Sequence, residues 1–248
     1  MDYEDHISAV ERDSAAIVSA LAEGPLDVPV PTCPDWTLVD LATHVGQFCG
    51  LWTHVICEGT EKAKTPFADP APAEQRSDWF ANWYEEAAGH LVTELRAAEP
   101  DAAVWTWDPS NETASFVARR AAHELSVHRF DAQTARTSPE PIDGALAVDG
   151  IEEIFAMLAA WRAGERDVRG GNGETIHLHA TDRDAEWTIT LAPDGVAVDR
   201  RHVKGDLALR AAVSDLELVL YQRPPLGPVD RFGDDSALDA WAQVFTFV

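Results

Sequence analysis

The chain has 248 residues, of which 43 are Asp or Glu and 19 are Lys or Arg, so its formal net charge is −24. A surface this acidic repels phosphate backbones and anionic lipid headgroups, which excludes electrostatically driven binding to nucleic acid or to a membrane. The hydrophobic content of 46% is that of a globular protein, and the length suffices for one large domain or two of ordinary size.

The cysteines and the first residues bear on the cellular compartment. Cys33, Cys49 and Cys57 contain no Cys-x-x-Cys pair, and the last two would lie on one predicted helix about 12 Å apart, too far for a disulfide. Residues 1–6 are acidic and lack the cationic start and apolar core of a signal peptide. No run approaches the ~18 consecutive apolar residues of a membrane span. We therefore expect a soluble, cytoplasmic protein, and no feature of the sequence favours a particular oligomeric state.

Apolar residues at helical spacing predict four helices in the first half of the chain. Proline-rich connections separate them, and the expected ranges are 3–22, 38–58, 75–98 and 112–136. Before the second helix, Thr37 is followed three residues later by Asp40, which resembles a capping box with Asp in place of Glu or Gln. Four amphipathic helices of this kind predict a helix bundle.

The pattern changes near residue 138, where Ser-Pro-Glu-Pro is typical of a linker. Beyond it, helical spacing and strand-like alternation predict helices at about 148–163 and 206–221 and strands at 175–180, 186–191 and 196–198. In the last of these helices, Leu209 is assigned to the same apolar stripe as Val213. The second half is therefore expected to be an α+β domain, with domains at 1–138 and 139–248.

The densest group of reactive side chains lies on the fourth predicted helix. Glu124 and His128 are four residues apart, so they share one helix face about 6 Å apart along the axis, a good spacing for two ligands of one metal ion. His123 and His128 are five residues apart and diverge by about 140°, so this is not the His-Glu-x-x-His motif, and His123 is expected to point elsewhere. Asp131 lies one turn beyond His128, close enough to orient its imidazole.

A third ligand would have to come from another helix. His44 is the best candidate, because it lies one turn after Leu41 and one turn before Phe48, at the edge of an apolar stripe. His54 and His90 are weaker candidates, since each lies beside its apolar stripe with no flanking pattern. From spacing alone, a hydrogen-bonded core histidine and a surface Glu–His pair remain as alternatives to a metal site.

Two separated segments also resemble motifs of a known family. Residues 33–44, Cys-Pro-Asp-Trp-Thr-Leu-Val-Asp-Leu-Ala-Thr-His, match the pattern Cys-Pro-x-Trp followed by Asp-Leu-x-x-His. Residues 123–131, His-Glu-Leu-Ser-Val-His-Arg-Phe-Asp, are similar to a second motif of the same family. In this order the two segments resemble the mycothiol-dependent maleylpyruvate isomerase family. Residues 214–218 and Arg223 look like its C-terminal domain, so the resemblance extends over nearly the whole chain.

The resemblance implies an α+β protein in which a DinB-like four-helix bundle is followed by a smaller α+β domain. It also implies a divalent metal ion, usually zinc, with ligands that map onto His44, Glu124 and His128, the three residues that the spacing favours. The implied activity is that of a mycothiol S-transferase or of a maleylpyruvate isomerase-like isomerase. Mycothiol would be the low-molecular-weight thiol cosubstrate, and the substrate a small electrophile.

The implied ligands, two histidines and one glutamate, are suited to activating a thiol on a zinc ion. Two histidines and one carboxylate leave the fourth position of a tetrahedral zinc ion open. A thiol bound there loses its proton at neutral pH, and the thiolate adds to the electrophile, to be transferred or to be eliminated again after rotation about the former double bond. The alternatives are a non-catalytic metal- or small-ligand-binding protein on the same fold and a thiol-independent metal-dependent enzyme.

Two arginines are candidate catalytic residues that bind a substrate carboxylate, because a guanidinium group grips carboxylates in a fork. Arg120 lies one turn before Glu124 on the same face, with a solvated salt bridge as the alternative. Arg223 corresponds to the family's arginine after the last long helix, although Gln222 stands here where many relatives have Gly. The net charge of −24 opposes an anionic substrate and favours an uncharged electrophile.

Other candidates carry weaker signals. Cys33 is interpreted as structural, because no base is adjacent to it in the sequence. Trp105 and Trp107 either line the site or pack against the end of the bundle. His177 and His179 share one face of a strand, but no third ligand is evident nearby, so we expect them to pack in the sheet.

Overall fold

The computed structural model describes residues 1–60, 77–163 and 170–246. The chain divides into two compact units, Met1–Glu140 and Pro141–Val248, which are described here one at a time as the N-terminal and the C-terminal unit. The predicted start of the third helix at residue 75 lies outside the described residues. None of the helices in the described ranges has a stretch long and apolar enough to cross a membrane.

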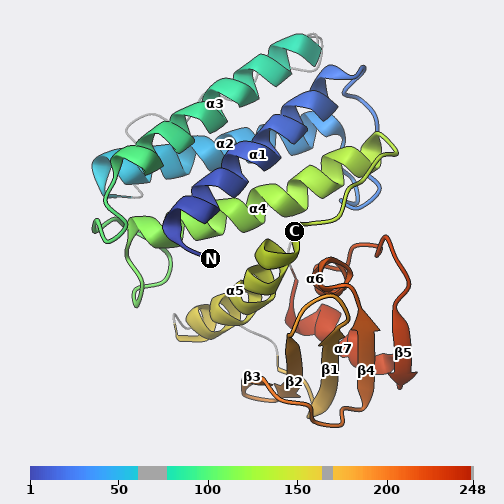
Figure 1. Ribbon diagram of the computed structural model, residues 1–248. Coiled ribbons are helices and arrows are strands. Elements are labelled where there is room, and N and C mark those ends of the chain that lie inside the picture. The colour runs from blue at the N-terminus through green and yellow to red at the C-terminus, as the bar shows by residue number, and fades with distance from the viewer. Residues whose placement is uncertain (61–76, 164–169, 247–248) are drawn as a thin grey trace. The chain divides into compact units, whose positions relative to one another are not determined.

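Within residues 1–60 and 77–140, the N-terminal unit is built from four long helices, as the apolar spacing predicts. They are α1 (Tyr3–Ala22), α2 (Leu38–Glu58), α3 (Ser77–Ala97) and α4 (Ala114–Ala135). Helix α1 packs against α3 and α4, and α2 packs against the same two helices, so the four close a bundle around one apolar core (Figure 1). The predicted four-helix bundle is confirmed.

A capping box fixes the start of α2, the helix that carries His44. The Thr37 hydroxyl accepts from the backbone N–H of Asp40, and Asp40 Oδ2 accepts from the backbone N–H of Thr37 at 2.8 Å. The sequence-predicted box is therefore present, with Asp in the role of Glu or Gln. By fixing where the helix begins, it fixes which residues of α2 face the bundle.

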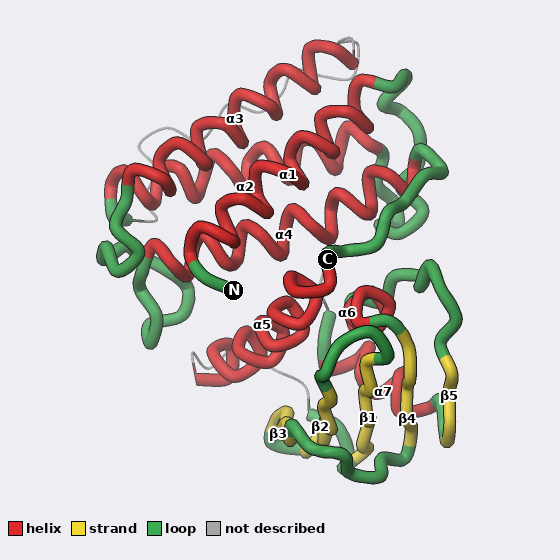
Figure 2. Tube along the Cα trace, in the orientation of Figure 1, coloured by secondary structure: helices red, strands yellow, loops and turns green. Residues whose placement is uncertain are grey.

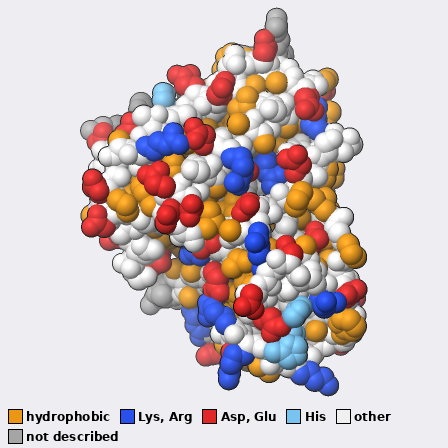
Figure 3. Space-filling model, viewed as in Figure 1, with side chains coloured by type: hydrophobic (Ala, Val, Ile, Leu, Met, Phe, Trp, Pro, Cys, Tyr) orange, Lys and Arg blue, Asp and Glu red, His pale blue; other side chains and the backbone are white. Residues whose placement is uncertain are grey.

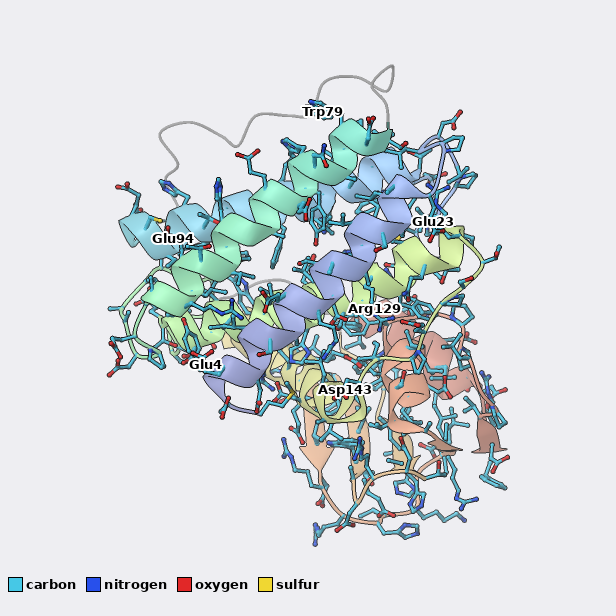
Figure 4. All side chains as sticks on the ribbon, turned by 45° about the horizontal axis from the view of Figure 1, so that its top comes forward. Glu4, Glu23, Trp79, Glu94, Arg129 and Asp143 are labelled. Carbon is cyan, nitrogen blue, oxygen red and sulfur yellow. The ribbon has the colours of Figure 1, made fainter. Side chains whose placement is uncertain are left out.

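A buried ion pair joins α4 to α1. Nε of Arg129 on α4 (labelled in Figure 4) lies 3.2 Å from Oδ1 of Asp13 on α1, and both side chains are almost fully buried. Arg129 also donates through Nη1 to the Gln133 amide oxygen and to the backbone carbonyl of Glu140. A guanidinium group held in this way restricts the rotation of α4 about its axis, which in turn sets the direction of the other polar side chains on that helix.

The described residues of the C-terminal unit combine a five-stranded sheet with three helices. In chain order the elements are α5 (Gly144–Ala163), β1 (Glu174–Ala180), β2 (Glu186–Ala192), β3 (Gly195–Asp199), β4 (Leu207–Ala211), α6 (Val213–Leu220), β5 (Asp230–Gly233) and α7 (Ser236–Val244). The strand order is β3-β2-β1-β4-β5, with β1 and β4 parallel and the other neighbours antiparallel (Figure 2). Helices α6 and α7 pack against the central strands. The predicted α+β class is confirmed.

The helix predicted at 206–221 is wrong in its first part, because Leu207–Ala211 forms strand β4. Leu207 and Leu209 are buried and alternate with less buried neighbours, and Leu209 pairs with Leu178 of β1 in a parallel ladder. Five residues give too little alternation to reveal a strand when a helix begins two residues later. Partners from the distant β1 decide the conformation, and local spacing does not.

Two further differences concern short signals. Helix α5 begins at residue 144, four residues before the predicted start, because Oδ1 of Asp143 (labelled in Figure 4) accepts from the backbone N–H groups of Ala145 and Leu146. The elements β5 and α7 were not predicted. All four residues of β5 are exposed, so the strand has no apolar pattern to detect.

The packing of α2 against α3 generates a stability prediction. A Cβ added to Gly46 of α2 would lie 2.2 Å from the indole ring of Trp83 on α3, whereas among the described residues nothing lies within 4 Å of a Cβ added to Gly89 of α3. We expect Gly46→Ala to lower the free energy of unfolding by about 1–3 kcal/mol through overpacking. The control Gly89→Ala should raise it by about 0.5–1 kcal/mol, because alanine is the better helix former. Urea unfolding followed by circular dichroism measures both, and a stabilised Gly46→Ala protein would contradict this packing.

Candidate metal centre

Three side chains from two helices converge inside the bundle. Nε2 of His44 on α2 lies 2.9 Å from Oε1 of Glu124 on α4, and Nε2 of His128 lies 3.5 Å from the same oxygen. One nitrogen or oxygen ligand atom from each of the three residues lies within 4.8 Å of the other two. The structure therefore brings together the three residues that spacing and resemblance select.

This triad is buried on one side and accessible on the other. Glu124 and His128 are each only 5% exposed, whereas the His44 side chain is 33% exposed. The triad thus lies at the edge of the core, with His44 as its partly exposed member. An accessible triad of this kind is typical of a catalytic metal site and not of a closed structural one.

The second oxygen of Glu124 is held by an arginine. Nη2 of Arg120 donates to Oε2 of Glu124 at 2.6 Å, and both side chains are about 95% buried, so this is a buried ion pair and not the solvated one considered as an alternative. Burial alone would raise the pKa of Glu124, but the charge of Arg120 and the hydrogen bonds of His128 and His44 outweigh it and lower the pKa well below its usual range. Glu124 is therefore an ionised carboxylate inside the bundle.

His128 is oriented by a carboxylate, as its spacing from Asp131 predicts. Nδ1 of His128 lies 2.9 Å from Oδ2 of the fully buried Asp131, which leaves Nε2 directed at Glu124. Burial would lower the pKa of His128, but its hydrogen bonds with Asp131, Cys33 and Glu124 outweigh it and raise the pKa well above the usual range. Metal-binding histidines commonly have such a carboxylate on the other ring nitrogen.

Cys33 is closer to this network than the sequence indicates. Its thiol donates to Oδ2 of Asp131 at 3.3 Å, so a carboxylate that is distant in the sequence lies beside it in the folded protein. The contact joins the loop before α2 to α4, 98 residues later, and no local pattern could reveal it. Cys33 thus supports Asp131, which in turn orients His128.

Sequence reasoning assigned no role to Trp36, although it lies in the segment that resembles the family. Its ring centroid is 5.1 Å from that of His44, and it stacks on His128 at 6.0 Å. Trp36 therefore contacts the imidazoles of both candidate ligands. The only signal in the sequence is its place between Cys33 and His44.

The other aromatic candidates pack elsewhere in the bundle. Trp105 stacks on Trp52 with centroids 6.1 Å apart, and Trp107 meets Phe116 edge to face at 4.9 Å. These contacts support the interpretation that the two tryptophans pack against the end of the bundle.

The remaining histidines of the N-terminal unit lie apart from the triad. His123 is buried with its ring 6.0 Å from that of His6, in agreement with the divergence expected from helical geometry. His54 is half-buried on α2, and His90 is exposed on α3. Within the described part of the chain, neither of these two belongs to a group of three metal-binding side chains.

Arg223 lies in the C-terminal unit, directly after α6. Its Nη1 donates to the backbone carbonyl of Tyr221 at 2.9 Å. The preceding Gln222 has φ 60°, the left-handed conformation that glycine favours, and its amide donates to the carbonyl of Phe245 at 2.8 Å. The glutamine therefore keeps the turn that a glycine would make, and contact of Arg223 with a substrate carboxylate remains a prediction.

The residues present fit a bound divalent metal ion. Two imidazole nitrogens and one carboxylate oxygen are a donor set that zinc takes in catalytic sites. The remaining polar atoms of two of these ligands are already engaged, since Asp131 holds Nδ1 of His128 and Arg120 holds Oε2 of Glu124. The fold and this triad define a class: a helical-bundle protein with a candidate metal centre, joined to an α+β unit.

Comparison with protein families identifies the chain more closely. Residues 7–133 match the model described as the mycothiol maleylpyruvate isomerase N-terminal domain, and residues 145–240 match the model described as the MDMPI C-terminal domain. The chain belongs to the mycothiol maleylpyruvate isomerase family, which is a family of enzymes, so the resemblance noted from the two motifs is confirmed. A comparison with curated proteins gives no match.

Solved structures show the same fold. The chain is similar to a crystal structure of a mycothiol-dependent maleylpyruvate isomerase, at 13% identity and a TM-score of 0.61, and to one of a histidine-to-alanine mutant, at 12% and 0.60. Each comparison covers 88% of this chain and 88% of the other. The likeness confirms the predicted DinB-like helical bundle followed by an α+β domain.

The buried ion pair at Glu124 generates a second stability prediction. In metal-free protein, Glu124→Gln should lower the free energy of unfolding by about 3–5 kcal/mol, because it leaves the Arg120 charge buried without its counter-charge. The control is Glu11→Gln, which breaks a pair with Arg96 whose side chains are both about half exposed, and we expect no measurable change. Urea unfolding in the presence of a chelator measures both, and equal effects would contradict the description of Glu124 as a buried carboxylate.

Proposed function

We propose that this chain is a divalent-metal-dependent enzyme that uses mycothiol, a low-molecular-weight thiol, as cosubstrate and acts on a small electrophile. The observation that carries the proposal is the convergence of His44, Glu124 and His128, whose ligand atoms lie within 4.8 Å of one another. Membership of the mycothiol maleylpyruvate isomerase family supports the choice of thiol.

A divalent ion, with zinc as the first candidate, would be held by Nε2 of His44, Oε1 of Glu124 and Nε2 of His128. When bound with its fourth position open, such an ion supplies a Lewis acid that lowers the pKa of a thiol, so that a thiolate is present at neutral pH. We assign no part in this step to the protein's own cysteines. Cys33 and Cys49 are buried, and burial raises the pKa of the Cys49 thiol.

The surrounding residues position the ligands. Asp131 holds the His128 ring in one orientation, and Arg120 holds Oε2 of Glu124 so that Oε1 is directed at the two imidazoles. Trp36 stacks on the ring of His128 and lies beside that of His44. We therefore assign Arg120 to catalysis as a positioning residue that acts through Glu124, and Arg223 remains the candidate for binding a substrate carboxylate.

Two reactions fit this site, and they differ in the fate of the thiol. In an isomerase, the thiolate adds to one carbon of a cis double bond conjugated to a carbonyl group, and the displaced electron pair moves to the carbonyl oxygen as an enolate. The former double bond, now single, rotates, and return of the electron pair expels the same thiolate and restores a trans double bond. In a transferase, the enolate instead takes up a proton, equivalent to the one that the thiol lost, and the carbon–sulfur bond stays. The similar solved proteins are maleylpyruvate isomerases, whereas the charge of −24 favours an uncharged electrophile. Both kinds of substrate therefore belong in the assay.

A cytoplasmic location accompanies this proposal. The three cysteines form no disulfide, and a reducing compartment is where a small thiol cosubstrate is maintained.

Metal binding is the first test. We expect His44→Ala to bind one equivalent of zinc less per chain than the wild type, because it removes one of three ligands. Elemental analysis after zinc loading and gel filtration measures the difference. The control is His90→Ala, an exposed histidine on α3, which should bind as much zinc as the wild type. Equal zinc content in His44→Ala and in the wild type would contradict the assignment of His44.

Turnover is the second test. Chelator-treated protein should regain activity only when both zinc and mycothiol are restored, assayed with maleylpyruvate and with uncharged electrophiles. We expect His44→Ala to lower kcat/KM by on the order of 100-fold or more, because the activated thiolate is lost. Turnover that needs zinc but no thiol would point to a thiol-independent metal enzyme, and ligand binding without any turnover to a binding protein. Either result would contradict the proposed function.

A further inference from the structure

A second cluster of metal-binding side chains lies on the sheet of the C-terminal unit. In the antiparallel pair of β1 and β2, His179 lies directly opposite Glu186, and His177 lies opposite Thr188. Alternate residues of a strand share a face, so these four side chains lie on one face of the sheet, opposite to the face of the buried Trp187. The sequence showed the two histidines, but not the carboxylate that the strand pairing brings beside them.

The segment between β3 and β4 adds a third histidine. Oγ1 of Thr188 contacts the backbone carbonyls of Arg201 at 3.2 Å and Val203 at 3.5 Å, so both neighbours of His202 are tied to this face. The ring of His202 meets that of His177 edge to face, with centroids 4.6 Å apart. In Figure 3, histidine side chains gather at the surface of the C-terminal unit.

All three imidazoles face the same carboxylate. Glu186 Oε1 makes a close contact with Nδ1 of His179, and Oε2 lies 3.4 Å from Nδ1 of His202 and 3.8 Å from Nε2 of His177. One ligand atom from each of the four residues lies within 4.8 Å of the other three. The earlier expectation that no third ligand lies near His177 and His179 is therefore wrong.

His177 supplies an independent observation. The residue is 4% exposed, and among the described residues none forms a hydrogen bond with its Nε2, since the nearest carboxylate oxygen is too distant at 3.8 Å. Buried polar atoms are normally satisfied, so a buried nitrogen aimed into a cluster of ligand atoms indicates a missing partner.

We propose that His177, His179, Glu186 and His202 form a second metal site, which takes a divalent ion of the zinc class. Three imidazole nitrogens and one carboxylate oxygen suit zinc and its transition-metal neighbours better than calcium or magnesium, which prefer oxygen ligands alone. Four protein ligands complete a tetrahedral shell and leave no open position, so the site is structural and not catalytic.

The side chains have the freedom to close around the ion. Tetrahedral zinc with bonds of about 2.0–2.1 Å keeps its ligand atoms roughly 3.4 Å apart, so separations of up to 4.8 Å must shorten. The side chains of His179 and His202 are 36% and 73% exposed, so they can rotate, whereas the buried His177 provides the fixed point. The bound ion would tie the segment between β3 and β4 to β1 and β2.

The test must separate this site from the candidate centre in the bundle. His44→Ala and His128→Ala together remove the bundle centre and leave the second site intact, in the full-length chain. After chelator treatment, we expect this variant to bind one equivalent of Co²⁺ per chain with the intense visible absorption of tetrahedral coordination. Zinc should raise its thermal unfolding temperature.

Single ligand changes in that background complete the test. His202→Ala and His179→Gln, both at exposed or half-exposed positions, should weaken Co²⁺ binding by at least ~10- to 100-fold, since even changes to residues behind metal ligands have effects of that size. The matched control His90→Ala should leave binding unchanged. The absence of a tetrahedral Co²⁺ spectrum in the background variant, or equal binding in His202→Ala and His179→Gln, would overturn the proposal.

If the variant that combines His44→Ala and His128→Ala fails to fold, single changes in the otherwise wild-type chain test the second site. There, His202→Ala should remove one equivalent of bound zinc and leave the mycothiol-dependent reaction intact, whereas His44→Ala should remove the other equivalent and the reaction. Zinc lost only in His44→Ala would reject the second site and support the proposed function. Zinc lost only in His202→Ala would reject the metal centre of the proposed function and support the second site.

Discussion

An ionised carboxylate in the middle of a helix bundle is the constraint on which the candidate site depends. Glu124 is 5% exposed, and burying a charge costs several kcal/mol unless compensating partners surround it. Arg120 binds one oxygen, and the imidazoles of His44 and His128 face the other. Asp131 then becomes necessary to orient His128. Each polar residue of this network therefore compensates for the burial of another, starting from Glu124. Together they bring two imidazole nitrogens close to one carboxylate oxygen.

Helical spacing predicted only those parts of the site that lie within one helix. Glu124 and His128 share a face of α4 because four residues make about one turn, and this is visible in the sequence. His44 could be ranked first among the histidines, but its meeting with Glu124 depends on the packing of α2 against α4, which spacing does not contain. Cys33 and Asp131 are 98 residues apart, so no local sequence pattern indicates their contact. Resemblance to a family supplied the missing assignment of His44, because a family motif includes residues that meet only after the helices pack. The spacing of apolar residues contains no such information.

In the C-terminal unit, too, contacts between different strands could not be predicted from spacing within one strand. The helical bundle was predicted well because long amphipathic helices give many turns of repeating pattern, whereas β4 has five residues and β5 is exposed throughout. Two histidines two residues apart on β1 were recognisable as sharing a face. The positions of Glu186 and His202 depend on strand register and on the hydrogen bonds of Thr188, and neither can be read from spacing. In both units, the sequence did not reveal which side chain of a different helix or strand would contact a given residue.

The two histidine–glutamate clusters illustrate how the same side chains suit different tasks. In the bundle, one ligand atom from each of three residues lies within 4.8 Å of the others, which suits the proposed site with an open position, while on the sheet four residues meet this condition, which suits the proposed closed site. Acidic side chains are otherwise spread over the visible surface, as Figure 3 shows, and they account for the solubilising charge of −24.

Anomalous diffraction at the zinc absorption edge, on crystals of zinc-loaded protein, tests the central claim most directly. We expect a peak within bonding distance of Nε2 of His44, Oε1 of Glu124 and Nε2 of His128. A map with no peak between these three atoms would contradict it.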